Sequence, residues 1–402
     1  MKQKVKIAIW HRYGPAEHTA GRHSVPLIIA RLAEHCEVHY FGMKTGHSVP
    51  ELIQQNAVIH LLPFHVKRSS TSDKVVKTIL WYLSVPIMAI WCKLKGIKLL
   101  YIEESLPLYV PLIRLFFGSR IAIAFADCFE DIYLSHGIAG TVARPLVQII
   151  RWIHVAVWKR LPLIFTMVEY GRKFLISKGV PADRIIAVYN PCDRNIYHPE
   201  DRRIARQRFN IPEDSFVIVH HGVLHPNKGN DRIIRALASV KKTLPNIKFL
   251  LVGDGPHMQF LKKLVKELEI SDTVIFTGWL PTEQDVNWAL NTADVGLVMR
   301  IGLPSDNFHV TDTLAHEMTC GLPIISARLA GIAEIITDGE TGFLFAPDNM
   351  AEFETKLLRL AQDSALREKF SRASLELSRR FFDMEKNANT VVERLLKVIE
   401  EK

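Results

Sequence analysis

The stretch of sequence that decides the fold is residues 216–229, which read FVIVHHGVLHPNKG. Four apolar residues in a row, 216–219, are typical of a strand that is buried on both faces. Gly222 then permits a turn, and residues 231–242 have the apolar spacing of a helix. A strand that leads through a turn into a helix predicts one βα unit of a parallel sheet covered by helices.

The same alternation of short β-rich runs and longer helical patterns fills both halves of the 402-residue chain. A chain of this length is too long for one ordinary core, so we predict two doubly wound α/β domains, over residues 1–195 and 196–383. A final helix over residues 384–402 carries an apolar stripe that needs a surface to cover. The expected strands are residues 5–10, 38–41, 58–62, 99–102, 121–125, 164–167 and 185–189, then 216–221, 248–252, 274–277, 295–299, 323–326 and 343–345.

Charge is distributed unevenly along the sequence. Residues 1–195 hold 25 Lys and Arg against 13 Asp and Glu, whereas residues 196–402 hold 26 against 29. The basic first half predicts an anionic partner, either a membrane surface or a phosphate-bearing acceptor, although cations that only keep the domain soluble would give the same count. The five cysteines are scattered, which indicates a reducing compartment and argues against a disulfide framework or a zinc site.

The first half also contains an uncharged run of 14 residues, 79–92, which reads ILWYLSVPIMAIWC. The run is shorter than the roughly 18–20 residues that span a bilayer, so a buried core helix is the first interpretation. Insertion at a membrane interface is the alternative, because aromatic residues here and among the basic residues of 144–160 suit a lipid headgroup region. We therefore expect a cytoplasmic protein, peripheral to the inner face of the plasma membrane. The aromatic residues are Trp81, Tyr82, Trp91, Trp152 and Trp158.

Two glycine-containing loops follow the first two predicted strands of the second half. The first contains Gly222, His225 and Lys228, and it opens a helix whose free N–H groups favour an anion. Lys228 would add a positive charge for a pyrophosphate, unless the loop is an ordinary turn with a surface lysine. In the second loop, VGDGP, Gly253 permits a close approach of the backbone to a ligand, and Asp254 could instead cap the next helix.

Two further segments complete the candidate ligand site of the second half. A strand ends at Gly278 beside Trp279, where the backbone could meet a nucleobase. A polar loop that begins near Asp306 leads into a helix that carries His316 and Glu317. All four segments follow strands, and ligands of doubly wound sheets bind at the carboxyl ends of strands. The active site is therefore expected in the cleft between the two domains.

Taken in order, these segments resemble the retaining GT-B glycosyltransferases of family 4, the glycosyl transferases group 1. The resemblance covers residues 165–350 well, and residues 1–160 only through the order of strands and helices. It implies two Rossmann-like domains facing across a cleft, with the donor nucleotide in the second domain, the acceptor in the first, and the last helix back on the first. No metal or other cofactor is implied, because basic groups and helix N-termini replace it. The matching motifs include Lys228-Gly229, VGDGP, FTGWLP at 276–281 and CGLPII at 320–325.

One departure from the family's pattern concerns the phosphate-binding loop. Members commonly have an arginine directly after the glycine that corresponds to Gly222, and this chain has Val223. The lysine that accompanies that arginine is present as Lys228. His221 or His225 could supply the missing hydrogen-bond donor, although histidines in surface loops are more often incidental.

A second departure concerns the family's Glu-x7-Glu motif, whose two positions fall on Phe308 and His316. The second Glu normally holds the ribose hydroxyls, and a histidine can also bond a hydroxyl. Glu317 lies one position later, and a slip that used it would rotate the helix by about 100°. We favour His316, with Glu317 as the close alternative. Asp306 and His309 are the nearest polar candidates for the sugar itself.

In the first domain, the resemblance assigns five residues to the acceptor side. The family's glycine loop after the first strand matches Gly14 and Arg22, and Glu169 matches an acid with a structural or acceptor-side role. Asp127 and Asp131 match two acidic positions after the strand at 121–125. A carboxylate there could orient or deprotonate the acceptor hydroxyl, unless these acids only complement a helix dipole.

The resemblance implies sugar transfer from a nucleotide-sugar donor with retention of anomeric configuration. The basic charge and the aromatic residues of the first half suggest a lipid-linked or polysaccharide acceptor, and with it a role in polysaccharide biosynthesis at the cell envelope. The expected catalytic residues are Lys228, which would stabilise the leaving diphosphate, and Asp127 and Asp131. Two alternatives are a catalytically silent GT-B module that acts as a partner protein and a GT-B-fold sugar-nucleotide epimerase. No nucleic-acid partner is expected, since no recognised module or Lys/Arg-dense helix occurs.

Overall fold

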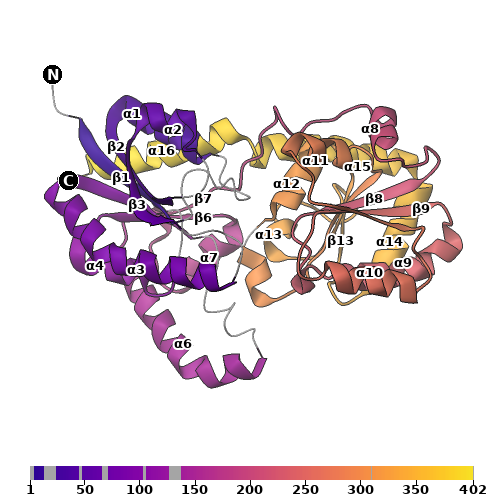
Figure 1. Ribbon diagram of the computed structural model, residues 1–402, viewed down its shortest axis with the longest axis horizontal. Helices are drawn as coiled ribbons and strands as arrows, with labels where there is room; N and C mark the ends of the chain where they lie inside the picture. The colour runs from indigo at the N-terminus through magenta and orange to yellow at the C-terminus, as the bar shows by residue number, and fades with distance from the viewer. Residues whose placement is uncertain are drawn as a thin grey trace. The chain divides into compact units, whose positions relative to one another are not determined.

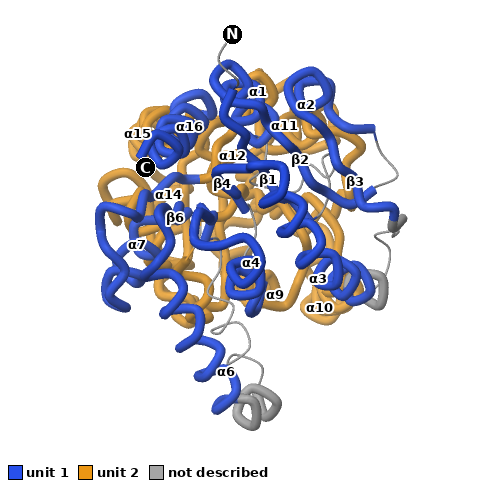
Figure 2. Tube along the Cα trace, turned by 90° about the vertical axis from the view of Figure 1, so that its left-hand side faces the viewer, with its two compact units in different colours: residues 1–189, 384–402 blue, residues 190–383 orange. Residues whose placement is uncertain are grey.

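The computed structural model describes residues 4–12, 24–44, 48–65, 71–102, 106–125, 137–308 and 310–401 (Figure 1). Contacts divide the chain into two compact units (Figure 2): unit 1 is residues 1–189 with 384–402, and unit 2 is residues 190–383. The first boundary between the two units therefore follows Tyr189, and not residue 195 as predicted. The reason is that the intervening segment packs within unit 2, where Asn190 donates to Asp312 (3.2 Å).

Unit 1 is built on a seven-stranded parallel sheet with the order β3-β2-β1-β4-β5-β6-β7. The central strand β1 is buried from Ile7 to His11 and pairs with both β2 and β4, so Ile7 lies opposite Val38 on one side and Leu99 on the other. Burial on both faces explains why these strands are continuous apolar runs. The strands are β1 Val5–His11, β2 Cys36–Lys44, β3 Val58–His65, β4 Ile97–Ile102, β5 Ile121–Phe125, β6 Leu163–Thr166 and β7 Ile185–Ala187.

Helices cover both faces of this sheet, with α1 and α16 on one side and α3 and α4 on the other (Figure 1). The C-terminal helix α16 buries Val391 and Leu395 in the same core cluster as Ile28 of α1, and an ion pair joins Arg31 to Glu385. The apolar stripe of α16 therefore covers unit 1. The helices of unit 1 are α1 Val25–His35, α2 Glu51–Asn56, α3 Thr71–Leu94, α4 Tyr109–Phe117, α6 Gly137–Trp158, α7 Glu169–Ser177 and α16 Met384–Glu400.

Helix α3 combines the two interpretations of its apolar sequence. One side is fully buried against unit 1, as at Trp81 and Val85, whereas Leu83 and Ile87 on the other side are 68% and 73% exposed. Most of the aromatic residues expected at a membrane interface are wrongly assigned, because they pack inward. Trp81 donates to the hydroxyl of Tyr109 (2.9 Å). The other two inward-facing tryptophans are Trp91, which packs on Phe41 and His60, and Trp158, which packs on Phe125; Trp152 is 73% exposed.

Unit 2 is built on a six-stranded parallel sheet with the order β10-β9-β8-β11-β12-β13. The chain moves outward from β8 through β9 to β10, and then from β11 through β12 to β13, so the order reverses between β8 and β11. Such a reversal opens a crevice at the carboxyl ends of the two central strands. The strands are β8 Phe216–His221, β9 Ile247–Val252, β10 Val274–Gly278, β11 Val295–Val298, β12 Ile324–Ala327 and β13 Phe343–Phe345. The predicted pair of doubly wound parallel sheets is confirmed.

The first helix of unit 2 is the basic helix α8, RRIARQR. Arg206 of this helix bonds Asp294 (2.9 Å), and Asp294 also accepts the N–H of Val217 (2.8 Å). Asp294 therefore fixes α8 to the start of β8. The helices are α8 Arg202–Arg208, α9 Asn230–Thr243, α10 Met258–Glu267, α11 Glu283–Leu290, α12 Asp312–Thr319, α13 Ala330–Ala333, α14 Met350–Gln362 and α15 Ser364–Phe381.

Candidate functional site

The loops that follow β8, β9 and β10 are bonded to one another at the carboxyl edge of the unit 2 sheet. Gly222 donates its N–H to Val252 (2.9 Å), and Gly253 donates to Gly278 (2.9 Å). A Cβ atom on Gly253 would lie 2.2 Å from the carbonyl oxygen of Gly222, and its φ is +126°. The close approach that requires this glycine is thus between neighbouring loops, which makes the edge a rigid main-chain platform.

Asp254 fixes the turn after β9 and does not cap the following helix. Its carboxylate accepts the N–H of Gly255 (2.6 Å), and its carbonyl accepts the N–H of Leu224 (2.9 Å). The residue that precedes α10 is His257, which makes no side-chain cap bond. The expected donor-site residue Asp254 therefore holds two loops together, and the capping alternative is wrong.

Lys228 is not an ordinary surface lysine. It ends the short helix η2, Pro226–Lys228, and lies half-buried beside other charges of unit 2. Burial, and then the charge of Arg300, lower the pKa of Lys228 from 10.5 to about 8, while Asp306 and Asp312 act in the opposite direction. A cation in such surroundings gains most from an anionic ligand.

Arg300, which the sequence did not single out, brings a second cation to the same place. It follows β11, which pairs with β8, so it lies at the point where the strand order reverses. Ile301 donates its N–H to the carbonyl of Asn227 (3.1 Å), and this bond ties the segment after β11 to the turn that carries Lys228. Arginine after a central strand at a reversal of strand order is the signal that could have identified this residue.

Asp306 holds Arg300 in position. It lies in the short helix η3, Pro304–Phe308, and is 1% exposed. One oxygen accepts from Arg300 (2.9 Å) and the other from the N–H of Leu303 (2.8 Å). These bonds make Asp306 a positioning residue, and they correct the expectation that it contacts the sugar. Phe308 is buried, and His309 lies outside the described residues.

His316 and Glu317 point to different surroundings on α12. The ring of His316 stacks on Tyr197 at a centroid distance of 3.7 Å, and its Nδ1 lies 3.0 Å from Nε2 of His221. Glu317 is fully buried, and a Cβ on Gly296 of β11 would lie 2.6 Å from its Oε2. Within the described part of the chain neither oxygen of Glu317 has a hydrogen-bond partner. Glu317 therefore has no access to a ligand. His316 is also buried, at 7% exposed, so its contact with a ribose hydroxyl stays a prediction.

Burial also determines the protonation states of Glu317 and His221. It raises the pKa of Glu317 well above its ordinary value, and with the charges of His220 and Lys228 it lowers the pKa of His221 to about 3. Nδ1 of His221 lies 3.7 Å from Oε1 of Glu317. A neutral acid and a neutral imidazole are consistent with this spacing, since a buried ion pair would need closer hydrogen bonds.

The remaining expected donor-side residues lie at the rim of the platform. His225 is exposed, and its Nδ1 accepts the N–H of Asn227 (3.4 Å), so it caps the turn before Lys228. Trp279 follows Gly278, whose φ is +69°, and its indole is 62% exposed. A large exposed aromatic at this edge suits stacking on a planar ligand group.

Most residues assigned to the acceptor side cannot be placed. Gly14, Arg22, Asp127 and Asp131 lie outside the described residues. Glu169, in the first turn of α7, accepts from Arg172 (2.8 Å), which also bonds the carbonyl of β7's first residue (3.1 Å). Glu169 therefore has the structural role that was one of its two expected assignments.

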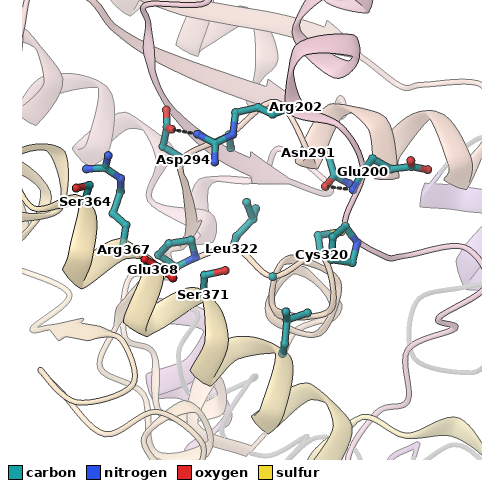
Figure 3. Close-up of a pocket in the computed structure, with 15 residues that line it drawn as sticks. Glu200, Arg202, Asn291, Asp294, Cys320, Leu322, Ser364, Arg367, Glu368 and Ser371 are labelled. Carbon is teal, nitrogen blue, oxygen red and sulfur yellow. Dashed lines mark hydrogen bonds and ion pairs between the residues drawn. The ribbon is translucent and has the colours of Figure 1, made fainter.

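A separate cavity of about 440 Å³ lies in unit 2 (Figure 3). Its walls include Asn291 and Asp294, which precede β11, and Leu322, which precedes β12. Arg202 at its rim is bonded to Asp294 (2.5 Å). The cavity lies at the amino ends of these strands, so it is distinct from the candidate site at their carboxyl ends.

These two Rossmann-like units define the class of the fold, GT-B. A solved structure of Anabaena Alr3699/HepE in complex with UDP matches it with a TM-score of 0.71 and 16% identity, over 98% of this chain and 100% of that one. Residues 201–376 match the family model described as Glycosyl transferases group 1. Unit 2 therefore belongs to that family, as the resemblance implied.

Curated relatives match the same part of the chain. The N-acetyl-alpha-D-glucosaminyl L-malate synthase of Bacillus anthracis is 30% identical over 186 residues, 46% of each chain. A GDP-mannose-dependent alpha-(1-6)-phosphatidylinositol monomannoside mannosyltransferase of Mycolicibacterium smegmatis is 28% identical over 151 residues, 37% of this chain and 39% of that one. The chain thus spans about half or less of the length of the curated relatives it matches.

Proposed function

We propose that the chain is a glycosyltransferase that moves a sugar from a nucleotide-sugar donor to an acceptor with retention of anomeric configuration. The observation that carries this proposal is the pair of cations, Lys228 and Arg300, where the strand order of a group 1 glycosyltransferase unit reverses. A departing nucleoside diphosphate carries its charge on the phosphate oxygens. Cations held in advance at that place lower the barrier more than mobile ones do, because they need no reorganisation.

Each donor group has a matching surface in unit 2. The diphosphate would meet Lys228, Arg300 and the N-terminus of α12, where Thr311 caps the first turn. Arg300 takes the place of the arginine that the family has at the position of Val223. The base would stack on Trp279, and His316 would bond a ribose hydroxyl. Asp127 and Asp131 remain the proposed acids on the acceptor side.

A screen of UDP-, GDP- and ADP-sugars by donor hydrolysis and by calorimetry tests the proposal. Binding of one donor is expected to weaken at least ten-fold in Lys228→Gln and in Arg300→Met, and to stay unchanged in Lys263→Gln, an exposed lysine of the same unit. The double variant Val223→Arg/Arg300→Met should recover part of the loss, because it returns an arginine to the family's position. Failure of every donor to bind would favour a silent module, and an epimerised donor would favour an epimerase.

For the acceptor, we propose a lipid-linked or polysaccharide glycan met at the inner face of the plasma membrane. Support comes from a set of exposed apolar side chains on α3, α4 and α6, which are neighbours in unit 1 (Figure 1). Large contiguous apolar patches are rare on monomeric proteins, so many exposed apolar side chains on neighbouring helices support a surface that meets a partner. The set, called here the apolar face, is Val75, Val76, Ile79, Leu83, Ile87, Ile90, Leu94, Leu115, Leu146, Ile149 and Trp152.

Charge at the ends of these helices favours a bilayer that contains anionic lipids as the occupant of the apolar face. Lys93 and Lys95 lie at the end of α3, and Lys159 and Arg160 follow α6. Among the described helices, one window of α3, Val75–Leu94, is long and apolar enough to cross a membrane by length and composition. Its opposite side is packed against the sheet, however, so we propose that α3 lies in the plane of the interface.

Co-sedimentation with vesicles of phosphatidylcholine and phosphatidylglycerol tests this placement. The variant Leu83→Gln/Ile87→Gln is expected to lose most vesicle binding, since it removes two of the most exposed apolar side chains of α3. Ile204→Gln changes a similarly apolar, 47% exposed side chain on α8 and should leave binding unchanged. Equal binding of both variants and the wild type would contradict a membrane role for the apolar face.

A further inference from the structure

Unit 1 contains a second concentration of positive charge, around a cavity of about 710 Å³. The cavity is bounded by the amino ends of β5, β6 and β7, by α7 and by the last turns of α16. Six cations from these elements line it. They are called here the basic groove and are Arg120, Arg160, Arg172, Arg184, Arg394 and Lys397.

The charge of the basic groove is only partly compensated. Three acids also line the cavity, namely Glu169, Asp183 and Glu401. The six cations therefore exceed the acids by three positive charges. Glu169 pairs with Arg172 at 2.8 Å, and Glu401 lies 4.0 Å from Lys397. Among the described residues, no carboxylate lies within ion-pair distance of the other four arginines.

The partners of those four arginines explain how they are held. Arg120 donates to the main-chain carbonyl of Glu401 (2.7 Å), Arg160 to that of Ala156 (2.6 Å) and Arg184 to that of Lys159 (3.5 Å). A carbonyl orients a guanidinium but does not neutralise it. Arg394 has no hydrogen-bond partner in the described part of the chain. Three of the four arginines are therefore oriented cations with unused donors, and no described residue uses the donors of Arg394.

The place of the groove in the fold separates it from the reaction site. Ligands that react in doubly wound sheets bind at the carboxyl ends of the strands, and the groove lies at the amino ends of β5, β6 and β7. A neighbouring cavity of about 440 Å³ shares Ser119 and Arg120 with it and adds Lys93 and Lys98. The positive surface therefore extends along this edge of the sheet.

We propose that the basic groove is an accessory binding site for a ligand that carries two or more phosphate groups. Guanidinium groups match phosphate oxygens through paired N–H donors, and several of them from different elements can bind a diphosphate from more than one side. A soluble phosphorylated molecule and the headgroup of a phosphorylated lipid share this chemistry. In either case the ligand binds away from the site of sugar transfer.

Calorimetric titration with inorganic pyrophosphate tests the site. Pyrophosphate also resembles the donor's diphosphate, so the titration is made in the Lys228→Gln variant, which weakens that competing site and leaves the groove intact. In the Lys228→Gln background, Arg184→Gln/Arg394→Gln should weaken pyrophosphate binding at least ten-fold. These two arginines contact no carboxylate, so their loss breaks no ion pair, and Lys263→Gln serves as the charge-matched control on unit 2.

The source of the phosphate groups is resolved with monomeric dioctanoyl phosphatidylinositol phosphate, a short-chain lipid that forms no bilayer at low concentration. Binding of this lipid but not of pyrophosphate, lost in Arg184→Gln/Arg394→Gln, would identify a lipid headgroup as the ligand. Binding of both would identify phosphate recognition in general. If neither probe distinguishes the double variant from the control, the proposal is overturned, and donor binding at Lys228 is unaffected by that outcome.

Discussion

Replacing Lys228 by methionine tests whether the site holds its cation at the expense of stability. The pKa of Lys228 falls from 10.5 to about 8, mainly through burial. Each unit of such a shift corresponds to about 1.4 kcal/mol between the two protonation states, so the folded state loses about 3 kcal/mol when it keeps the proton. Lys228 is only half-buried, and solvent screening reduces this to about 1–2 kcal/mol. Methionine fills similar space without charge, so Lys228→Met should raise the free energy of unfolding by about that amount at pH 7.

The dependence of this gain on pH follows from the direction of the shift. Below pH 8 both the folded and the unfolded protein hold the proton, and the destabilisation by Lys228 is complete. Between pH 8 and 10.5 the folded protein releases its proton first, so the wild type recovers stability relative to the variant. Above 10.5 both states are neutral and the difference vanishes.

Denaturant unfolding at pH 7 and at pH 10, followed by intrinsic fluorescence, measures both quantities. Lys263→Met, on an exposed lysine of the same unit, should change the free energy of unfolding little at either pH. Pyrophosphate should raise the melting temperature of the wild type more than that of Lys228→Met, because the anion restores the charge balance of the site. The reasoning is refuted if Lys228→Met is no more stable than the wild type at pH 7, or if its gain does not shrink by pH 10.

Three further outcomes are expected. Gly253→Ala should lower the free energy of unfolding by more than about 3 kcal/mol, because its Cβ would collide with the Gly222 carbonyl. Gly278→Ala, with φ +69° and free space around the Cβ, should lower it by only about 1–2 kcal/mol in the same denaturant measurement. Glu317→Gln should stabilise the protein, and the gain should grow from pH 4 to pH 8, because a buried acid with a raised pKa resists ionisation in the folded state; a gain independent of pH would contradict this. Trp279→Ala should weaken donor binding by about 1–3 kcal/mol, the range of base–aromatic stacking, with a melting temperature within a degree or two of the wild type, as its indole is exposed.

The strands were predictable because parallel sheets bury both faces of a strand. Residues 216–219 and 249–252 are uninterrupted apolar runs, and each lies within an observed strand. Ends were less predictable: β2 begins at Cys36 and extends to Lys44, although its sequence includes Glu37, His39 and a glycine. There, hydrogen bonds with β1 and β3 continue the strand past the residues whose side chains favour it.

The periodicity of apolar residues predicted where the helices lie, but it did not always predict which face of a helix is buried. The sequence of α3 is apolar almost all around, so it does not indicate which side meets the sheet. The sheet decides, and it takes Trp81 into the interior while Leu83 and Ile87 face outward. Aromatic residues were therefore a poor guide to the exposed surface of this helix, because their size makes them the side chains that a core buries first.

Within the candidate site, sequence reasoning found what local spacing determines and missed what the order of the strands determines. Gly222 and Lys228 belong to one loop, so a short motif contains both. Arg300 reaches the same place only because β11 pairs with β8 and not with the strand before it in sequence. When residues 300–306 are considered alone, Arg300 and Asp306 form what looks like an ordinary structural ion pair.

The loss of an arginine at Val223 therefore need not mean the loss of a phosphate site. A diphosphate requires positive charge near its oxygens, and the positions after β8 and after β11 face the same crevice, so either can supply it. An arginine after β8 and an arginine after β11 do not place the same demands on the rest of the structure, however. Arg300 must be held by Asp306, whose carboxylate is 1% exposed, and the pair is stable because Leu303 supplies the remaining hydrogen bond. In the proposed site, an arginine after β11 thus depends on a buried acid, and Asp306 is expected to be as necessary as the cation that it positions.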